Sequence, residues 1–356
     1  MNFYDIEAKI RNDDIQMNFI ALSSGDINGI GPEVILKSIP VLQKHSIYKP
    51  VLFCHKSIIE EYVTHINWVL PFEINEIADV SEWQEKKINC IAPNTEAIPI
   101  ELGKISSSSG KYAMASIKAA TESILAGATK ALVTAPISKE AIYLAGFSVP
   151  GHTEYLAELC GNEKTPLMVL ATETLRVALT TIHVPLHKIS ELITFENVEH
   201  ACRDFYQSLR QDFGIFKPRL ALLGLNPHAG DGGVLGREEL EIISPVIKKL
   251  NEEGFLISGP FAADGFFGSK QWKQYDGVLA MYHDQGLIPF KTIAFHDGVN
   301  ITCNLPIVRT SPDHGTGFSI AGKNLADPQS FQEAYKTAQT IISNRGIYLK
   351  SIATIS

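Results

Sequence analysis

Three of the eleven histidines stand at the ends of apolar, strand-like runs: His183 in ALTTIHVPL, His228 in LLGLNPHAGDGG and His283 in VLAMYHDQG. Each is followed within two residues by Pro, Gly or Asp. A single histidine on an apolar element is usually a core residue. Three at equivalent positions favour a divalent metal site with an open position for water or substrate. Their wide spacing matches no local zinc signature.

Two aspartates lie close to these histidines in the sequence or share their setting. Asp284 follows His283 directly, and Asp264 stands in GPFAADGFF. Carboxylates of this kind orient a ligating histidine or transfer protons. For Asp264, a simple turn in which the carboxylate accepts from backbone amides is the alternative.

A second group of residues has the chemistry to bind an anion. His152 and Thr153 precede an apolar helical run, so Thr153 is expected to cap a helix whose N-terminus attracts anions. Lys291, Asn300 and Arg309 flank strand-like pieces, and Lys and Arg pair with phosphate or carboxylate groups. The alternatives are a capping turn with an exposed histidine and a pair of solvated surface cations.

Two glycine-rich segments complete the candidate chemistry. SSGDINGIGPEV (23–34) fits neither the Gly-x-Gly-x-x-Gly register nor a Walker lysine pattern, so a strand-to-helix turn and direct ligand contact both stay open. In DHGTGFSIAGKNLADP (313–328), glycines such as Gly315 permit close backbone approach. Asn324 and His314 have the groups to bond or stack against an adenine.

Alternating apolar strands and amphipathic helices must position these residues. This alternation predicts an α/β fold with a mostly parallel sheet covered on both faces, and ligands in such sheets bind beyond the carboxyl ends of strands. Ser138 and Asp327 are expected helix caps, and Pro245 should interrupt a helix. Strands are expected over 18–26, 49–55, 131–136, 167–172, 175–184, 219–227 and 275–284, and helices over 32–39, 111–127, 138–146, 197–214, 237–254 and 327–345.

Composition excludes several classes of protein. The 356 residues carry 31 Lys and Arg against 39 Asp and Glu, a net charge of −8, which disfavours nucleic-acid and anionic-membrane partners. The five scattered cysteines form no CxxC pair and indicate a reducing compartment. No signal peptide or bilayer-length apolar stretch is present, so the expected location is the cytoplasm.

Taken together, the motifs resemble the 4-hydroxythreonine-4-phosphate dehydrogenase family of vitamin B6 biosynthesis. The resemblance runs from about residue 18 to about residue 345, and the order and combination of its motifs are very specific. Those motifs are GD-x-x-GIGPE (25–33), VTAP-x-x-K (133–139), GHTE (151–154), TTIHVPL (180–186), NPHAGDGG (226–233), GP-x-x-AD (259–264), YHDQGL (282–287), GVNIT (298–302) and RTSPDHGT (309–316).

The resemblance implies a homodimer of two α/β/α domains, with the fold of isocitrate and isopropylmalate dehydrogenases and an active site at the domain cleft and the dimer interface. Residues 18–345 would form the two interleaved domains, after an N-terminal arm (1–17) and before a C-terminal tail (346–356). AGKNLADP is similar to the adenine-binding loop of those dehydrogenases.

The resemblance also assigns site residues. A divalent metal would be held by three histidines, the third from the partner subunit; imidazole nitrogens suit zinc or cobalt better than magnesium. The implied sets are His183, His228 and His283 for the metal and His152, Thr153, Lys291, Asn300 and Arg309 for the substrate. From the residues themselves, we expect His314, Gly315, Thr316 and Asn324 to bind the cofactor and Asp264 or Asp284 to transfer protons.

The implied reaction is NAD- or NADP-dependent oxidation of 4-phosphohydroxy-L-threonine, then decarboxylation to 3-amino-2-oxopropyl phosphate. Alternatives are a dehydrogenase of 4-phosphothreonate or 4-phosphoerythronate, a phosphate acyltransferase, which would not need three histidines, and a three-histidine hydrolase, which would not need the 313–328 segment. The sequence departs from the family at Ile27–Asn28, where Pro-Ala is common, and His296 has no assigned role.

Overall fold

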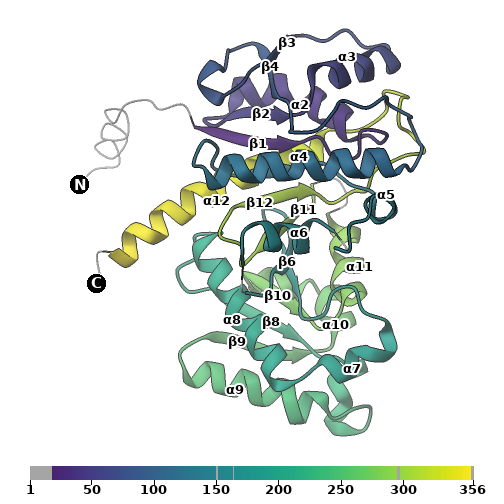
Figure 1. Ribbon diagram of the computed structural model, residues 1–356. Coiled ribbons are helices and arrows are strands. Elements are labelled where there is room, and N and C mark those ends of the chain that lie inside the picture. The colour runs from purple at the N-terminus through teal and green to yellow at the C-terminus, as the bar shows by residue number, and fades with distance from the viewer. Residues whose placement is uncertain (1–17, 150, 163, 295–296, 354–356) are drawn as a thin grey trace.

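The computed structural model describes residues 18–149, 151–162, 164–294 and 297–353. The expected N-terminal arm (1–17) and His296 lie outside these residues. Within them, one twelve-stranded sheet has the order β3-β4-β2-β1-β5-β12-β11-β6-β7-β10-β8-β9 (Figure 1). The strands are β1 (Phe19–Ser23), β2 (Lys49–Phe53), β3 (Glu73–Glu76), β4 (Lys87–Ile91), β5 (Leu132–Thr134), β6 (Leu167–Ala171), β7 (Arg176–Leu179), β8 (Arg219–Leu223), β9 (Leu256–Phe261), β10 (Gly277–Ala280), β11 (Val299–Cys303) and β12 (Arg309–Pro312).

The sheet consists of two parallel blocks that run in opposite directions. The strands from β3 to β12 in the sheet order are parallel, and so are β7, β10, β8 and β9. Between the blocks, β11 is antiparallel to both β12 and β6, and β6 is antiparallel to β7. The predicted α/β class with a mostly parallel sheet is therefore confirmed, while the division into two domains stays a prediction.

Helices cover both faces of the sheet, but the two faces differ. One face carries a single continuous core that includes side chains of α2, α8, α9 and α12. The other face carries two separate cores, one under α4 to α6 and one under α10 and α11. The α-helices are α2 (Gly31–His45), α3 (Lys56–His65), α4 (Ser107–Leu125), α5 (Lys139–Leu144), α6 (His152–Leu159), α7 (Ile189–Leu192), α8 (Phe195–Gln211), α9 (Ser244–Glu252), α10 (Ala263–Gly268), α11 (His283–Ile293) and α12 (Gln329–Ala353).

The gap between these two cores falls on the central strands. Side chains alternate between faces along a strand. On β11, Val299, Ile301 and Cys303 belong to the continuous core, so Asn300 and Thr302 face the side with the gap. The middle of this face is therefore polar, between two apolar flanks.

Several local predictions can be compared with the structure. Ser138 caps α5, with its Oγ accepting from the Ala141 N–H at 3.1 Å, and Asp327 accepts from the Gln329 N–H at 2.9 Å. A π-helical turn (Glu239–Ile243) runs directly into α9, and Ile243 and Ser244 have helical backbone angles, so the predicted interruption at Pro245 is wrong. Pro245 lies in the first turn of α9, where its missing N–H costs no helical hydrogen bond.

The predicted tail is partly wrong, because α12 continues through residues 346–353. Gln207 of α8 donates to the Tyr348 hydroxyl at 2.9 Å, and the Arg210 guanidinium lies 5.6 Å from the Tyr348 ring centroid. These contacts extend the helix beyond the expected stop. None of the described helices is long and apolar enough to cross a membrane, and the cytoplasmic location stays a prediction.

Candidate active site

The polar gap is filled by a group that we call the central polar cluster: Thr134, His152, Thr153, Asn300, Thr302 and Arg309. Arg309 is the first residue of β12 and is 3% exposed. Its guanidinium donates to the Thr134 hydroxyl at 2.8 and 3.2 Å and to the Thr302 hydroxyl at 3.0 Å. No carboxylate of the described residues forms an ion pair with it. Burial lowers the pKa of Arg309 to about 9, and the nearby Glu154 carboxylate opposes this shift.

Two unsatisfied polar atoms belong to the same cluster. The His152 Nε2 and the Asn300 Oδ1 are buried and have no hydrogen-bond partner among the residues that the structure describes. Burial, and then the Arg309 charge, hold the pKa of His152 well below its usual value, so its ring is neutral. Buried polar groups without partners are rare in native proteins. A buried cation beside donors and acceptors of this kind fits an anionic, hydrogen-bonding ligand such as a phosphate or carboxylate.

Two sequence predictions for this cluster need correction. Thr153 does not cap α6, because the N-cap is Gly151; instead the Thr153 hydroxyl lies 3.5 Å from the Thr302 hydroxyl. Asn300 and Arg309 were expected to flank strands, but they lie within β11 and β12. These strands are short and carry polar side chains, so the apolar pattern missed them.

Lys291 differs from Arg309 because its charge is paired. It lies in the last turn of α11, not beside a strand, and its Nζ is 3.3 Å from the Asp313 Oδ1. Burial raises the pKa of Asp313, and the Lys291 charge opposes this shift. The structure therefore makes Lys291 and Asp313 one unit, and Asp313 is a residue that the sequence analysis did not single out.

The three predicted metal ligands, which we call the histidine edge, follow three neighbouring strands. His183, His228 and His283 come after the carboxyl ends of β7, β8 and β10, and β10 pairs with both others in parallel. The rings of His183 and His283 lie 5.7 Å apart between centroids. The described residues nevertheless contain no group of three His, Cys, Asp or Glu side chains placed to hold a metal.

The chemistry of the histidine edge fits a divalent metal even though one chain does not gather all three rings. Burial, then the charges of Lys139 and His283, lower the pKa of His183, and metal ligation requires neutral imidazole. The Nδ1 of His283 lies 2.7 Å from the Asp284 Oδ1, the carboxylate–histidine contact that commonly orients a ligating ring. Lys139 and Glu154 are further charged neighbours, and both stand in motifs that the sequence analysis quoted without giving them a role.

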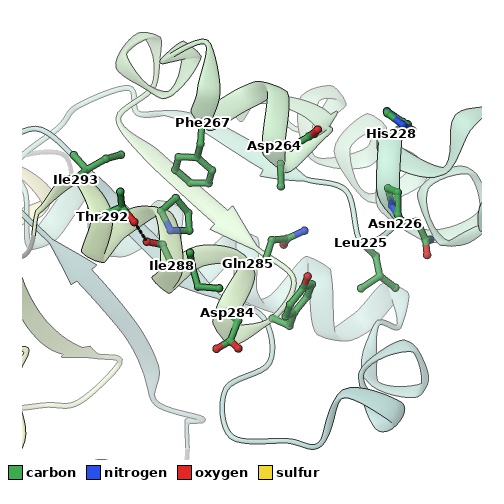
Figure 2. Close-up of a pocket in the computed structure, with 14 residues that line it drawn as sticks. Leu225, Asn226, His228, Asp264, Phe267, Asp284, Gln285, Ile288, Thr292 and Ile293 are labelled. Atoms are coloured by element: carbon green, nitrogen blue, oxygen red, sulfur yellow. Dashed lines mark hydrogen bonds between the residues drawn. The ribbon is translucent and has the colours of Figure 1, made fainter.

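His228 lines a cavity of about 570 Å³ between α10 and α11, with Asp264 and Asp284 on its walls (Figure 2). Apolar side chains such as Phe267 and Ile288 make up much of the rest. Figure 2 shows the Asp284 carboxylate well away from Asp264. Asp264 lies in the first turn of α10. Its role in proton transfer stays a prediction.

The backbone that presents His228 is strained. Residues 228–232 all have positive φ, including His228 (52°), Ala229 (50°) and Asp231 (45°). Left-handed backbone costs a non-glycine residue roughly 1–2 kcal/mol. Strain of this kind persists only where the surroundings enforce it, and it clusters at functional sites.

The two glycine-rich segments found in the sequence pack against each other. The Ile30 N–H donates to the Thr316 carbonyl at 2.9 Å, and a Cβ on Gly29 would lie 2.5 Å from that carbonyl oxygen. This close approach favours the interpretation of residues 23–34 as a packed turn. At the far end, Lys37 donates to the Asn324 and Ala326 carbonyls at 3.2 and 3.0 Å.

Within the proposed cofactor segment, His314 and Asn324 are in different environments. The His314 Nε2 is buried with no hydrogen-bond partner in the ranges that the structure covers, and its Nδ1 lies 3.0 Å from the Gly315 carbonyl. Asn324 is exposed. Asn28, which departs from the common family motif, has a structural role. Its side chain accepts from the Glu101 N–H at 2.8 Å and donates to the Lys104 carbonyl at 3.0 Å.

Comparison with known proteins agrees with this architecture. The family model described as pyridoxal phosphate biosynthetic protein PdxA matches residues 46–338. A 4-hydroxythreonine-4-phosphate dehydrogenase from Bacteroides thetaiotaomicron is 43% identical over 326 residues, which cover 92% of this chain and 89% of the relative.

Two solved structures extend the comparison. The 4-hydroxythreonine-4-phosphate dehydrogenase of Klebsiella pneumoniae superimposes with a TM-score of 0.79 at 34% identity, covering 93% of this chain and 99% of that one. A terephthalate 1,2-cis-dihydrodiol dehydrogenase from Burkholderia xenovorans gives a TM-score of 0.60 at 30% identity, covering 91% and 98%. With its motifs, its fold and these matches, the chain belongs to the PdxA family of dehydrogenases.

Proposed function

We propose that this chain oxidises the 3-hydroxyl of 4-phosphohydroxy-L-threonine with NAD or NADP and then decarboxylates the product to 3-amino-2-oxopropyl phosphate, in pyridoxal phosphate biosynthesis. The observation that carries the proposal is the buried Arg309 guanidinium, which forms no ion pair with a carboxylate in the described part of the chain and lies beside the unsatisfied atoms of His152 and Asn300. A phosphorylated hydroxy acid supplies the anionic and hydroxyl groups that such a cluster lacks.

The chain's own residues would bind and orient the substrate. Arg309 offers a planar fork of donors to an anionic group, and Asn300 accepts from a hydroxyl or ammonium. The ring of neutral His152 already donates to the Ala135 backbone, so its Nε2 would accept a hydrogen bond from the substrate, and Thr153 adds a hydroxyl. Lys291, held by Asp313, extends the positive charge toward the cofactor segment.

A divalent ion, with zinc favoured over cobalt or magnesium, would be held by His183, His228 and His283 across a homodimer. When bound, it supplies a Lewis acid that stabilises negative charge on the substrate oxygen. Asp284 would orient the His283 ring through the 2.7 Å contact, which leaves Asp264 as the better candidate to carry a proton.

The nicotinamide cofactor would lie along His314, Gly315, Thr316 and Asn324 and accept the hydride. The unpaired His314 Nε2 and the exposed Asn324 support this placement. Oxidation at the 3-position yields a β-keto acid, whose bond to the carboxylate then breaks to release carbon dioxide. The resulting enol takes up a proton at carbon.

A second candidate within the same chemistry is the oxidation of 4-phosphothreonate or 4-phosphoerythronate. The Burkholderia xenovorans structure favours keeping it, because a chain of this fold at 30% identity is named for a different substrate. The test is a panel of these three phosphorylated acids with NAD and NADP, following reduced nicotinamide and carbon dioxide. Turnover of phosphohydroxythreonine is the expected result; turnover of phosphoerythronate alone would overturn the first choice.

A further inference from the structure

Glu239 is a buried carboxylate that the proposed reaction does not use. It is 2% exposed and begins the π-helical turn Glu239–Ile243. Its Oε1 accepts from the Asn226 N–H at 2.7 Å, and its Oε2 accepts from the Asn226 side-chain amide at 3.0 Å. No cation of the part of the chain that the structure describes forms an ion pair with it. Burying a carboxylate is costly unless hydrogen bonds compensate for the lost water, and here both oxygens bond to Asn226.

The loop that Glu239 contacts is the left-handed turn that carries His228. A Cβ on Gly230 would lie 2.6 Å from the Glu239 Oε2, and one on Gly224 would lie 3.0 Å from the Oε1. The carboxylate therefore fills the space beneath the turn. The positive φ of Ala229 and Asp231 needs such support, because L-residues avoid this conformation.

The π-helical turn explains how Glu239 reaches this position. Glu241 of the same stretch pairs with Arg237 at the surface. Glu238 is only partly buried and accepts from Ser190 and from the Asn226 side-chain amide, each at 2.7 Å. Glu239 alone also accepts from the Asn226 backbone N–H. Single π-turns within helices are frequent at functional sites. Here the fully buried carboxylate is that of Glu239, which lies beneath the backbone that follows β8, while Glu238 shares the Asn226 side-chain amide from the partly buried side.

We propose that Glu239 is a positioning residue, whose carboxylate holds Asn226 and the left-handed turn 228–232 so that His228 faces the cavity between α10 and α11. The role of His228 as a metal ligand rests on the proposed function; the support of the turn by Glu239 does not.

The test compares Glu239→Gln with Glu241→Gln, a matched change in the same π-turn at a side chain that is 56% exposed. Amide hydrogen exchange of residues 226–236 in the metal-free protein should be about 10–100-fold faster in Glu239→Gln, the effect of losing a charged hydrogen bond. Cobalt(II) affinity, measured by calorimetry, should fall by about 10–100-fold, as for other residues that orient a ligand. Glu241→Gln should match the wild type in both.

A second change separates positioning from general damage. Adding Ala229→Gly to Glu239→Gln should partly restore slow exchange and cobalt affinity, because glycine adopts positive φ without strain. If Glu239→Gln does not fold, Asn226→Ser removes the amide that Glu239 holds and should act in the same direction. Unchanged exchange across 226–236 in the Glu239 or Asn226 variant would overturn the proposal. If the wild type binds no cobalt, the proposed metal site fails, and the exchange result still decides the role of Glu239.

Discussion

The central polar cluster and the histidine edge belong to one chain but are built in different ways. The cluster stands on three adjacent strands, β5, β12 and β11, and on the first turn of α6, so its donors are held by the sheet itself. The histidine edge follows strand ends on two loops and on the first residue of α11, with the His183 and His283 rings close together and His228 lining the cavity. Arg309 is buried, whereas His228 is exposed on a strained turn.

The difference shows which part of the proposed chemistry a single chain completes. The polar cluster needs only a ligand to satisfy its charge and its unpaired atoms. The histidine edge needs a metal and, under our proposal, a second copy of the chain. Anion binding should therefore survive changes that abolish catalysis, and we expect variants of the two regions to separate these properties.

The largest effect should come from His228→Ala. Removing a ligand from an exposed turn should reduce metal-dependent turnover by at least about 100-fold. The change buries no new polar group, so cooperative thermal unfolding should persist. Steady-state assays with added zinc or cobalt measure the loss, and His187→Ala, an exposed histidine of a nearby segment, is the control. Full activity of His228→Ala would remove the histidine edge from the mechanism.

Arg309→Met should weaken substrate binding without lowering stability. It removes the fork that binds the anion, which should raise the substrate KM by about 100-fold, the order expected when one partner of a buried charge contact is lost. It also removes a buried, unpaired charge, so the thermal midpoint should equal or exceed that of the wild type. A variant with unchanged KM would show that Arg309 does not contact substrate.

Mixing subunits tests whether the histidine edge is shared. His183→Ala and His283→Ala are each expected to be inactive. If the metal site takes His283 from the partner, a fully exchanged equal mixture regains about a quarter of the sites, since half of each mixed dimer is intact. Activity after denaturation and joint refolding measures this. The 5.7 Å approach of the two rings within one chain makes the opposite result informative: no recovery would assign both to one subunit.

The smallest expected effect is a pH dependence set by His152. The pKa of His152 in the folded chain is below the ordinary value of 6.5. As the pH falls below 6.5, His152 therefore becomes protonated in the unfolded chain but stays neutral in the folded chain. Stability is fully present above that pH and should fall by up to about 1.4 kcal/mol per pH unit below it. Urea unfolding at pH 7.5 to 5 should show a shallower slope in His152→Gln. Equal slopes of stability against pH in the wild type and in His152→Gln would show that the His152 ring is exposed to solvent in the folded chain.

The sequence correctly placed the three histidines after strand ends, because strand ends are marked by apolar runs followed by Pro, Gly or Asp, while their role as metal ligands stays a prediction. That β7, β10 and β8 are neighbours came only from the sheet order. The sequence indicated Arg309 and Asn300 as candidate ligand-binding residues from their chemistry, but it did not place them within strands, since VNITC and RTSP lack an apolar alternation. It also missed the helix under Lys291, where Gly286 and Pro289 interrupt the pattern.

Other features depend on contacts between distant segments and leave no periodic signal. The packing of Ile30 against Thr316, the pairing of Lys291 with Asp313, and the support of the 228–232 turn by Glu239 are of this kind. The motifs contained many of these residues, but only the fold shows which of them touch.

The most direct test of this account is calorimetric binding of 4-phosphohydroxy-L-threonine to protein treated with a chelator, compared among the wild type, His228→Ala and Arg309→Met. We predict that the metal-free wild type and His228→Ala bind the substrate equally, and that Arg309→Met binds at least about 100-fold more weakly. Equal binding by Arg309→Met, or no binding by the metal-free wild type, would contradict the claim that one chain completes the anion site by itself.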